Sequence, residues 1–153
     1  NRTLIDAQKA PLQLALAEKP WLVKINRQEA AAMLNLPATA DSATLCAMLQ
    51  QAGAENAIVT DGAEGATLAE STGAVWHIAS PPDLAIINPI CSGDAMNAGI
   101  LTGMEQGMPL PEATRLGVAC AAANCLTPTS GVVDPKNVSP LLEKVAITPK
   151  KLA

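Results

Sequence analysis

The sequence predicts an α/β fold: a mostly parallel sheet sandwiched by helices, with one antiparallel hairpin. Short runs of apolar and β-branched residues, typical of buried strands, alternate with segments whose apolar residues recur at helical spacing. The 153 residues are 49% hydrophobic and 16% charged, a composition that supports a folded core rather than a disordered chain. This alternation indicates βαβ units, in which a helix connects two parallel strands.

Local signals place the individual elements. The predicted helices begin at a capping residue, such as Asn26, Asp41 or Ser42, or at a proline, and they end near glycine or proline. A turn at residues 71–73 joins two extended segments and indicates the hairpin. The predicted strands span residues 2–6, 21–25, 57–60, 66–70, 74–78 and 145–147. The predicted helices span residues 11–18, 27–34, 42–51, 92–106, 111–126 and 138–144.

Composition excludes several classes of partner. The net charge is −4 and the only aromatic residues are two tryptophans, so neither a basic face nor an aromatic stacking surface for nucleic acid is expected. No apolar run approaches the ~20 residues of a membrane helix, and the first residues do not resemble a signal peptide. The four cysteines form no Cys-x-x-Cys pair and there is one histidine, which argues against zinc. We expect reduced thiols in a cytoplasmic protein.

The most informative segment is residues 88–99, Asn-Pro-Ile-Cys-Ser-Gly-Asp-Ala-Met-Asn-Ala-Gly. A loop of small residues that opens a helix directs backbone N–H groups outward at the positive end of the helix dipole, where anions bind. Asp94 adds a carboxylate beside that place, a combination that suits phosphoryl transfer. Alternatively, Asp94 only stabilises the start of the helix. A reactive Cys91 thiol is a further alternative, because a helix N-terminus stabilises a thiolate.

Two weaker motifs precede this segment. Asn26 and Glu29 are three residues apart on one helix face, where an amide and a carboxylate can organise a hydrated magnesium ion. The same pattern is also a capping-box-like helix start. Thr60-Asp61-Gly62-Ala63-Glu64-Gly65 contains glycines that permit positive φ and close approach of the backbone to a ligand, although such turns also simply join strands.

Ser92-Gly93-Asp94-Ala95 resembles the C-terminal signature of the PfkB (ribokinase-like) sugar kinases. The resemblance implies that Asp94 is the catalytic base, which removes the proton from a sugar hydroxyl as that hydroxyl attacks the γ-phosphate of ATP. It also implies that the amides of Cys91, Ser92 and Gly93 form an anion hole for the charge that develops.

The resemblance extends to the nucleotide and metal sites. The Asn-x-x-Glu motif of this family is tied to magnesium and phosphate, which implies that Asn26 and Glu29 organise Mg²⁺. The family's Ser/Thr-x-Gly-x-x-Gly turn implies phosphate contacts for three residues here. A lysine that is frequent in the family implies a fourth phosphate contact, and an Ala-rich segment implies a contact with the adenine. These implied nucleotide contacts are Thr60, Gly62, Gly65, Lys24 and Asn124.

The residues of these motifs are most similar to the motifs of family members that phosphorylate ketohexose phosphates, such as tagatose 6-phosphate or a fructose phosphate. The implied cofactors are ATP and Mg²⁺, and the implied partner is a sugar or sugar phosphate; homo-oligomer formation is left open. Two residues depart from the family pattern. Cys91 stands where the family nearly always has glycine, so we expect a clash or a less favourable backbone there. Asp61 brings a negative charge into the turn, which would repel ATP if it faced the phosphates.

The resemblance covers residues 6–145 and matches the C-terminal half of the family's fold. We therefore expect residues 1–153 to be the nucleotide-binding part of such a kinase, without the sugar-binding half and its lid. Two other functions stay open. One is a truncated or degenerate, non-catalytic kinase piece that binds only nucleotide or acts through assembly. The other is an unrelated doubly wound ligand-binding domain in which residues 92–94 merely cap a helix.

Overall fold

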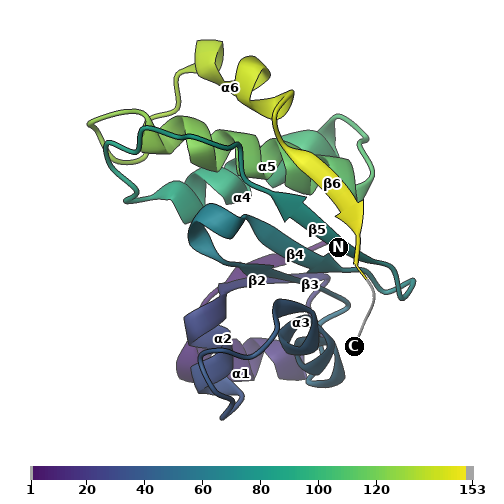
Figure 1. The fold of residues 1–153 in the computed structure, drawn as a ribbon. Helices are drawn as coiled ribbons and strands as arrows, with labels where there is room; N and C mark the ends of the chain where they lie inside the picture. Colours follow the sequence, from purple (N-terminus) through teal and green to yellow (C-terminus); the bar gives the residue numbers. More distant parts are fainter. Residues whose placement is uncertain (1, 151–153) are drawn as a thin grey trace. The chain divides into compact units, whose positions relative to one another are not determined.

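A computed structural model of the chain describes residues 2–150 and shows the expected α/β fold (Figure 1). Its six strands are hydrogen-bonded in the order β1-β2-β3-β4-β5-β6. The strands are β1 (Leu4–Asp6), β2 (Leu22–Asn26), β3 (Asn56–Thr60), β4 (Ala66–Ala69), β5 (Val75–Ala79) and β6 (Ala146–Pro149). The helices are α1 (Lys9–Ala17), α2 (Arg27–Met33), α3 (Ser42–Gln51), α4 (Ser92–Glu105), α5 (Leu110–Cys125) and α6 (Pro135–Leu142), with a short 3-10 helix, η1 (Gly62–Glu64).

Most predicted elements agree with the structure to within two residues at each end, and two differences have a clear cause. Helix α6 begins three residues earlier than predicted, because the Asp134 side chain accepts a hydrogen bond from Lys136 N at 3.0 Å and Pro135 occupies the first turn. The turn after β3 contains η1, which the sequence pattern did not reveal. Both differences lie at short polar segments, where periodicity carries little information.

The sheet is mixed. β1 pairs with β2 and β2 pairs with β3 in parallel, whereas β3 and β4 are antiparallel. β4 and β5 are neighbours joined by a tight turn in which Glu70 N donates to Ala74 O at 2.9 Å, as the predicted hairpin requires. The parallel part therefore lies in the first three strands.

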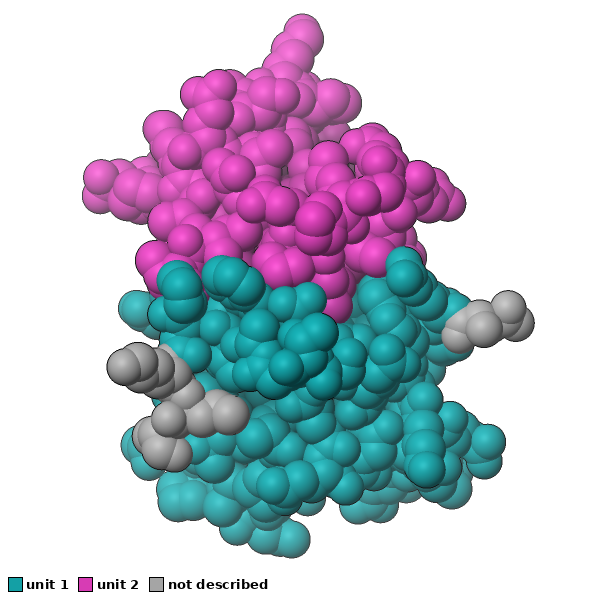
Figure 2. Space-filling view, turned by 90° about the vertical axis from the view of Figure 1, so that its right-hand side faces the viewer, with its two compact units in different colours: residues 1–77, 149–153 teal, residues 78–148 magenta. Residues whose placement is uncertain are grey.

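The chain divides into two compact units, coloured separately in Figure 2: unit 1, residues 1–77 with 149–153, and unit 2, residues 78–148. In unit 1, helices α1, α2 and α3 lie on one side of β2 and β3 (Figure 1). Alternate residues of the strands, such as Val23 and Val59, face these helices and are fully buried. The helices contribute Leu12, Leu45 and Leu49 to the same core.

Unit 2 is built on the packing of α4 against α5, and small residues let these helices approach closely. A Cβ on Gly117 would lie 2.7 Å from Ile100 Cγ1 and 2.8 Å from the Met96 carbonyl oxygen. Arg115 of α5 donates from Nε to Val145 O and from Nη2 to Leu142 O, both at 2.9 Å, and so holds the end of α6. Within residues 2–150, none of the helices has the length and hydropathy needed to cross a membrane.

All four cysteines lie within the described residues and are free thiols. Cys46 is fully buried in the core of unit 1, and burial raises the pKa of its thiol to about 12. Burial also raises the pKa of the Cys120 and Cys125 thiols. These three side chains therefore behave as small apolar groups at neutral pH.

Replacement of Gly117 by alanine is expected to destabilise the protein. Alanine improves helix propensity by about 1 kcal/mol, but the added methyl group meets both a side chain and a backbone carbonyl, and overpacking costs about 1–3 kcal/mol. We expect a net loss of about 1 kcal/mol in urea unfolding. Thr102→Ala on the exposed face of α4 is the matched control and should change stability by less than about 0.5 kcal/mol. Equal stability of Gly117→Ala and the wild type would contradict the close helix contact.

The buried Cys46 thiol predicts an alkaline loss of stability. An unfolded thiol loses its proton near pH ~8.5, whereas the folded thiol keeps it to much higher pH, so the free energy of unfolding falls as pH rises above ~8.5. Between roughly pH 7.5 and 9.5 this contribution is about 1 kcal/mol. Urea unfolding at both pH values should show a smaller decrease for Cys46→Ala, which lacks the titrating group, than for the wild type. Parallel pH dependence of the two proteins would be evidence against a buried neutral thiol.

Candidate active site

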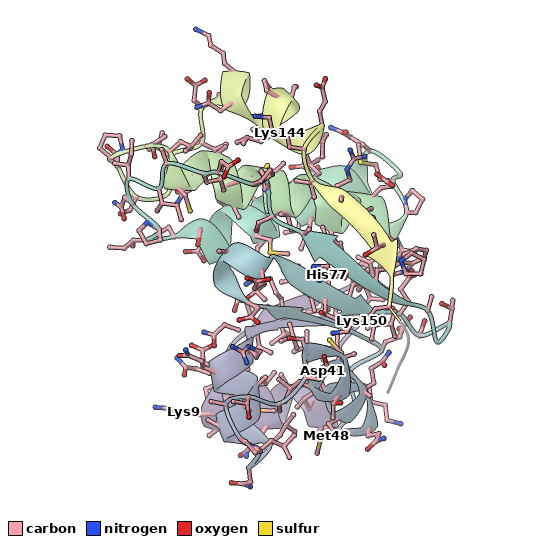
Figure 3. The ribbon with its side chains drawn as sticks, in the orientation of Figure 1. Lys9, Asp41, Met48, His77, Lys144 and Lys150 are labelled. Carbon is pink, nitrogen blue, oxygen red and sulfur yellow. The ribbon has the colours of Figure 1, made fainter. Side chains whose placement is uncertain are left out.

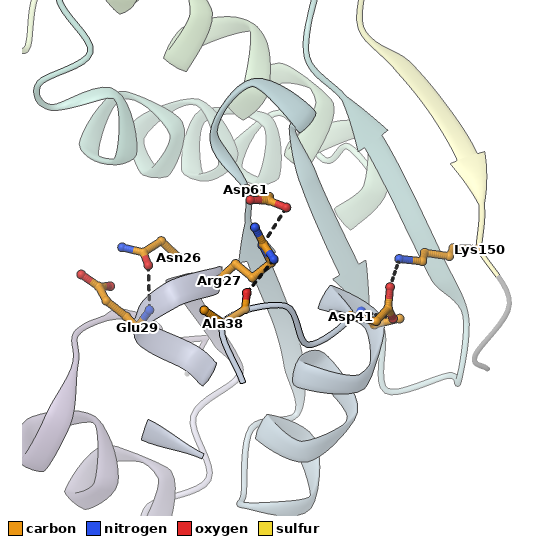
Figure 4. Close-up of polar contacts among 8 residues, drawn as sticks. Asn26, Arg27, Glu29, Ala38, Asp41, Asp61 and Lys150 are labelled. Carbon is orange, nitrogen blue, oxygen red and sulfur yellow. Dashed lines mark hydrogen bonds and ion pairs between the residues drawn. The ribbon is translucent and has the colours of Figure 1, made fainter. Parts of the chain in front are cut away.

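In unit 1, predicted site residues meet at the carboxyl ends of two strands. Asn26 ends β2, Thr60 ends β3, and the two are register partners in the parallel ladder. Neighbouring strands lie about 4.8 Å apart, so these two polar residues are adjacent. The Asn26 side-chain oxygen accepts a hydrogen bond from Glu29 N at 2.9 Å, which caps α2 (Figure 4). The capping alternative is thus confirmed, and the cap fixes Asn26 and Glu29 together at the start of α2.

The donor chemistry of this pair fits magnesium that arrives with a nucleotide. An amide oxygen and a carboxylate are acceptable magnesium ligands, and Mg²⁺ usually keeps several waters and takes few protein ligands. Within residues 2–150, no group of three or more His, Cys, Asp or Glu side chains is arranged to hold a metal ion. With one amide and one carboxylate, Asn26 and Glu29 fit an ion held chiefly by water and phosphate oxygens.

Lys24, an implied phosphate contact, forms an ion pair in this structure. Its Nζ lies 2.8 Å from Asp6 Oδ2, and its side chain is only 5% exposed. The pairing follows from the sheet, because Asp6 and Lys24 are register partners on β1 and β2. Asp6 ends its strand and stabilises a cation that would otherwise be buried without a counter-charge.

The turn between β3 and β4 has the conformation for which its glycines were singled out. Gly62 has φ +53° and Gly65 has φ +95°, a region that favours glycine. The turn is closed by hydrogen bonds from Asp61 N to Gly65 O at 2.8 Å and from Glu64 N to Asp61 O at 3.0 Å. A Cβ on Gly62 would meet no atom within 4 Å, so a ligand can approach the backbone there.

A pocket of about 340 Å³ lies in unit 1 beside this turn and the start of α3. Two ion pairs contribute to its walls: Arg27 Nε with Asp61 Oδ2 at 2.8 Å, and Lys150 Nζ with Asp41 Oδ1 at 2.6 Å (Figure 4). Asp41 and Lys150 are labelled in Figure 3, with His77, which also lines the pocket. The hydrogen bond from Lys150 is the main cause of a lowered pKa of the Asp41 carboxyl.

In unit 2, the residue that precedes α4 has a left-handed backbone conformation. Cys91, its N-cap residue, has φ +64° and ψ +13°, in the left-handed region that favours glycine. The expected unfavourable backbone at Cys91 is therefore present. Asp94 lies in the first turn of α4 and is exposed, and among residues 2–150 its carboxylate has no ion-pair partner.

One of the three implied anion-hole amides is already used. Ser92 N donates to Pro89 O at 3.2 Å within the loop. Across residues 2–150, the N–H groups of Cys91 and Gly93 have no hydrogen-bond acceptor. These two amides, at the positive end of the 14-residue α4, are the donors that remain for an anion.

Two asparagines tie the loop before α4 to the loop after α5. Asn124 is fully buried; its amide donates to Ile90 O at 2.9 Å, and its side-chain oxygen accepts from Gly131 N at 2.9 Å. Asn88 donates to Pro128 O and to Ser130 Oγ, both at 3.1 Å. Asn124, singled out as an adenine contact, thus holds two loops in place in this structure.

A family model of known sequences matches residues 2–137, and its description is pfkB family carbohydrate kinase. The chain belongs to the pfkB family of carbohydrate kinases. It is 31% identical over 150 residues to 1-phosphofructokinase of Haemophilus influenzae, covering 96% of this chain and 47% of that protein. It is also 31% identical over 149 residues to 1-phosphofructokinase of Bacillus subtilis, covering 96% and 48%. The chain therefore spans about half the length of the curated relatives it matches.

Solved structures of other kinases share the fold. The structure of Escherichia coli phosphofructokinase-2 in complex with potassium matches 93% of this chain and 47% of that one, with a TM-score of 0.84 and 23% identity. Arabidopsis thaliana ribokinase complexed with ribose and ATP matches 93% and 47%, with a TM-score of 0.79 and 18% identity. The fold is ribokinase-like, and about half of it is present. Family membership also excludes the unrelated doubly wound domain considered above.

Sequence reasoning missed two residues, one in each unit, that make side-chain contacts beside predicted site residues. Arg27 was passed over as an unspecified position of the Asn-x-x-Glu motif, although it starts α2 and pairs with Asp61. Asn88 was taken only as part of the loop sequence. Its position before a proline was a usable signal, because an asparagine side chain commonly bonds the backbone two residues on; here it accepts from Ile90 N at 3.0 Å.

Replacement of Cys91 by glycine is expected to stabilise the protein. The left-handed conformation costs a side-chain-bearing residue about 1–2 kcal/mol, of which the greater unfolded-state freedom of glycine offsets a part. We expect Cys91→Gly to raise the free energy of unfolding by about 0.5–1 kcal/mol. Cys91→Ala is the matched control, because it removes the thiol but keeps the Cβ, and it should give no such gain. A gain of equal size in both variants would show that the thiol, and not the backbone, is the cause.

Proposed function

We propose that this chain carries the nucleotide site and the catalytic base of an ATP-dependent kinase that phosphorylates a hydroxyl of a ketohexose phosphate. The observation that carries the proposal is Asp94, an exposed carboxylate in the first turn of a helix whose N-terminal amides can bind an anion; within residues 2–150 this carboxylate has no ion-pair partner. Its position in a pfkB-family chain supports the role of base.

The proposed reaction is a single displacement at the γ-phosphorus of ATP. Asp94 takes the proton of the attacking hydroxyl, the hydroxyl oxygen forms a bond to the γ-phosphorus, and the bond to the bridging oxygen of ADP breaks with its electron pair. Negative charge develops on the transferring phosphoryl oxygens, and the N–H groups of Cys91 and Gly93 would stabilise it. Asn124 and Asn88 act indirectly, because they hold in place the loop that precedes these amides.

The unit 1 residues would bind the phosphates of the nucleotide. Thr60, Gly62 and Gly65 would contact them through the turn after β3, whose backbone is accessible at Gly62. Lys24 would add a positive charge from β2, shared with Asp6. When bound through water to Asn26 and Glu29, Mg²⁺ supplies charge neutralisation of the phosphates.

The ketohexose phosphate is proposed from the relatives, since several proteins similar to this chain are 1-phosphofructokinases. The residues that select the sugar would lie in the part of these relatives that this chain does not cover. Assembly is open as well; one similar solved structure is a tetrameric inhibited form of E. coli phosphofructokinase-2.

A second candidate function is a non-catalytic nucleotide-binding piece. The specific observation that favours it is Cys91, whose strained backbone stands within the proposed anion hole. This candidate shares the nucleotide site with the kinase proposal and differs in predicting no phosphoryl transfer from any form of the protein.

Asp94→Asn separates the two functions. We expect the polypeptide of the full reading frame to release ADP from Mg-ATP in the presence of fructose 1-phosphate or tagatose 6-phosphate. Loss of the base should lower this turnover at least ~100-fold while leaving the affinity for Mg-ATP, measured by calorimetry, within about twofold. The 153-residue chain alone should bind Mg-ATP and show little or no sugar-dependent turnover.

Asp83→Asn is the matched control, since it makes the same chemical change at another exposed position of unit 2 and should behave as the wild type. Sugar-dependent turnover that survives Asp94→Asn would refute the assigned base. Absence of turnover with intact Mg-ATP binding would favour the non-catalytic function.

A further inference from the structure

Asp61 is the residue whose charge conflicts with the proposed nucleotide site. It stands between Thr60 and Gly62, two of the three turn residues that would contact phosphates. A carboxylate and a nucleotide phosphate are both negative at neutral pH and repel each other, most strongly where solvent screening is incomplete. The Asp61 side chain is 34% exposed, so water screens it only in part.

Arg27 forms an ion pair with Asp61. Its Nε lies 2.8 Å from Asp61 Oδ2, and its own side chain is 29% exposed. Its Nη1 donates to Ala38 O at 2.7 Å. A single guanidinium therefore joins the first residue of α2, the segment before α3 and the turn after β3 (Figure 4).

The position of Arg27 in the sequence makes the contact possible. Arg27 directly follows Asn26, and Asp61 directly follows Thr60. Because Asn26 and Thr60 are register partners in parallel strands, Arg27 and Asp61 lie side by side where the two strands end. A phosphate site in this turn needs an accessible backbone and no net repulsive charge. Gly62 is exposed, and the ion pair with Arg27 offsets the charge of Asp61.

We propose that Arg27 is a positioning residue for the nucleotide: it cancels the charge of Asp61 and holds this carboxylate away from the phosphates. The inference rests on the proposed function, because it takes the turn of residues 60–65 as the phosphate site. It assigns Arg27 no contact with the nucleotide itself. Its consequence is that the loss of Arg27 harms binding only while Asp61 is charged.

A charge cycle on the 153-residue chain tests this role. Mg-ATP and adenosine are titrated by calorimetry into the wild type, Arg27→Gln, Asp61→Asn and the double variant. We expect Arg27→Gln to weaken Mg-ATP binding at least about tenfold, and this loss to shrink in high salt. Asp61→Asn should bind within about twofold of the wild type or more tightly, and the double variant should recover to within about threefold. Adenosine, which has no phosphate, should bind all four proteins equally.

Two controls make each outcome decisive. Lys150→Gln breaks the other ion pair of the same pocket and removes the same charge, and it should leave Mg-ATP affinity within about twofold. Thermal unfolding of each variant shows whether it is folded. If Arg27→Gln does not fold, Arg27→Lys, which keeps the charge, should bind Mg-ATP within about threefold of the wild type, and a loss as large as about tenfold would overturn the inference.

A double variant as weak as Arg27→Gln would overturn the inference, since Arg27 would then act by direct contact or by packing. Equal weakening of adenosine and Mg-ATP would overturn it too, because that result indicates a structural effect. If the wild type binds adenosine but not Mg-ATP, or neither, the proposed function itself fails and this role fails with it.

Discussion

The parallel register of β1, β2 and β3 governs where unit 1 carries its polar side chains. The middles of β2 and β3 are buried, so residues such as Val23 and Val59 leave no room there for solvated polar groups. Polar residues are therefore displaced to the carboxyl ends, where Asn26 and Thr60 are partners across the ladder. Lys24 and Asn56 are exceptions: the register provides Asp6 as the counter-charge of Lys24, and the Asn56 amide donates to Trp21 O at 2.8 Å. A slip of one residue between β1 and β2 would bury Lys24 without a partner.

Ion pairs between distant segments then set the local charge around the strand ends. Asp61 would make the turn after β3 unfavourable for phosphate. In the proposed role, Arg27 offsets this charge through contacts that join the start of α2 to the turn and to the segment before α3. The ion pair between Lys150 and Asp41 is of another kind. It joins the segment after β6 to the cap of α3 and stabilises unit 1 without a direct connection to the turn.

In unit 2, helix packing and loop contacts present a loop of small residues at the start of a helix. Close packing of α4 and α5 at Gly99 and Gly117 leaves little freedom in the helix pair. Asn124 and Asn88 then attach the loop before α4 to the loop after α5. The strained Cys91 is tolerated because these surroundings hold the backbone in place, and this is the usual condition for strain at functional sites.

Local signals in the sequence determined the α/β fold class, nearly all the elements and the glycine conformations of the turn after β3. Caps, prolines and glycines act within a few residues, so their effects can be read from the order of residues alone. The Asp94 motif identified the family for the same reason, since its chemistry is contiguous. Only the tertiary structure decided the partners of Lys24, Arg27 and Asn124. Asn124 bonds a residue 34 positions away, and such contacts depend on how the elements pack, which no local pattern encodes.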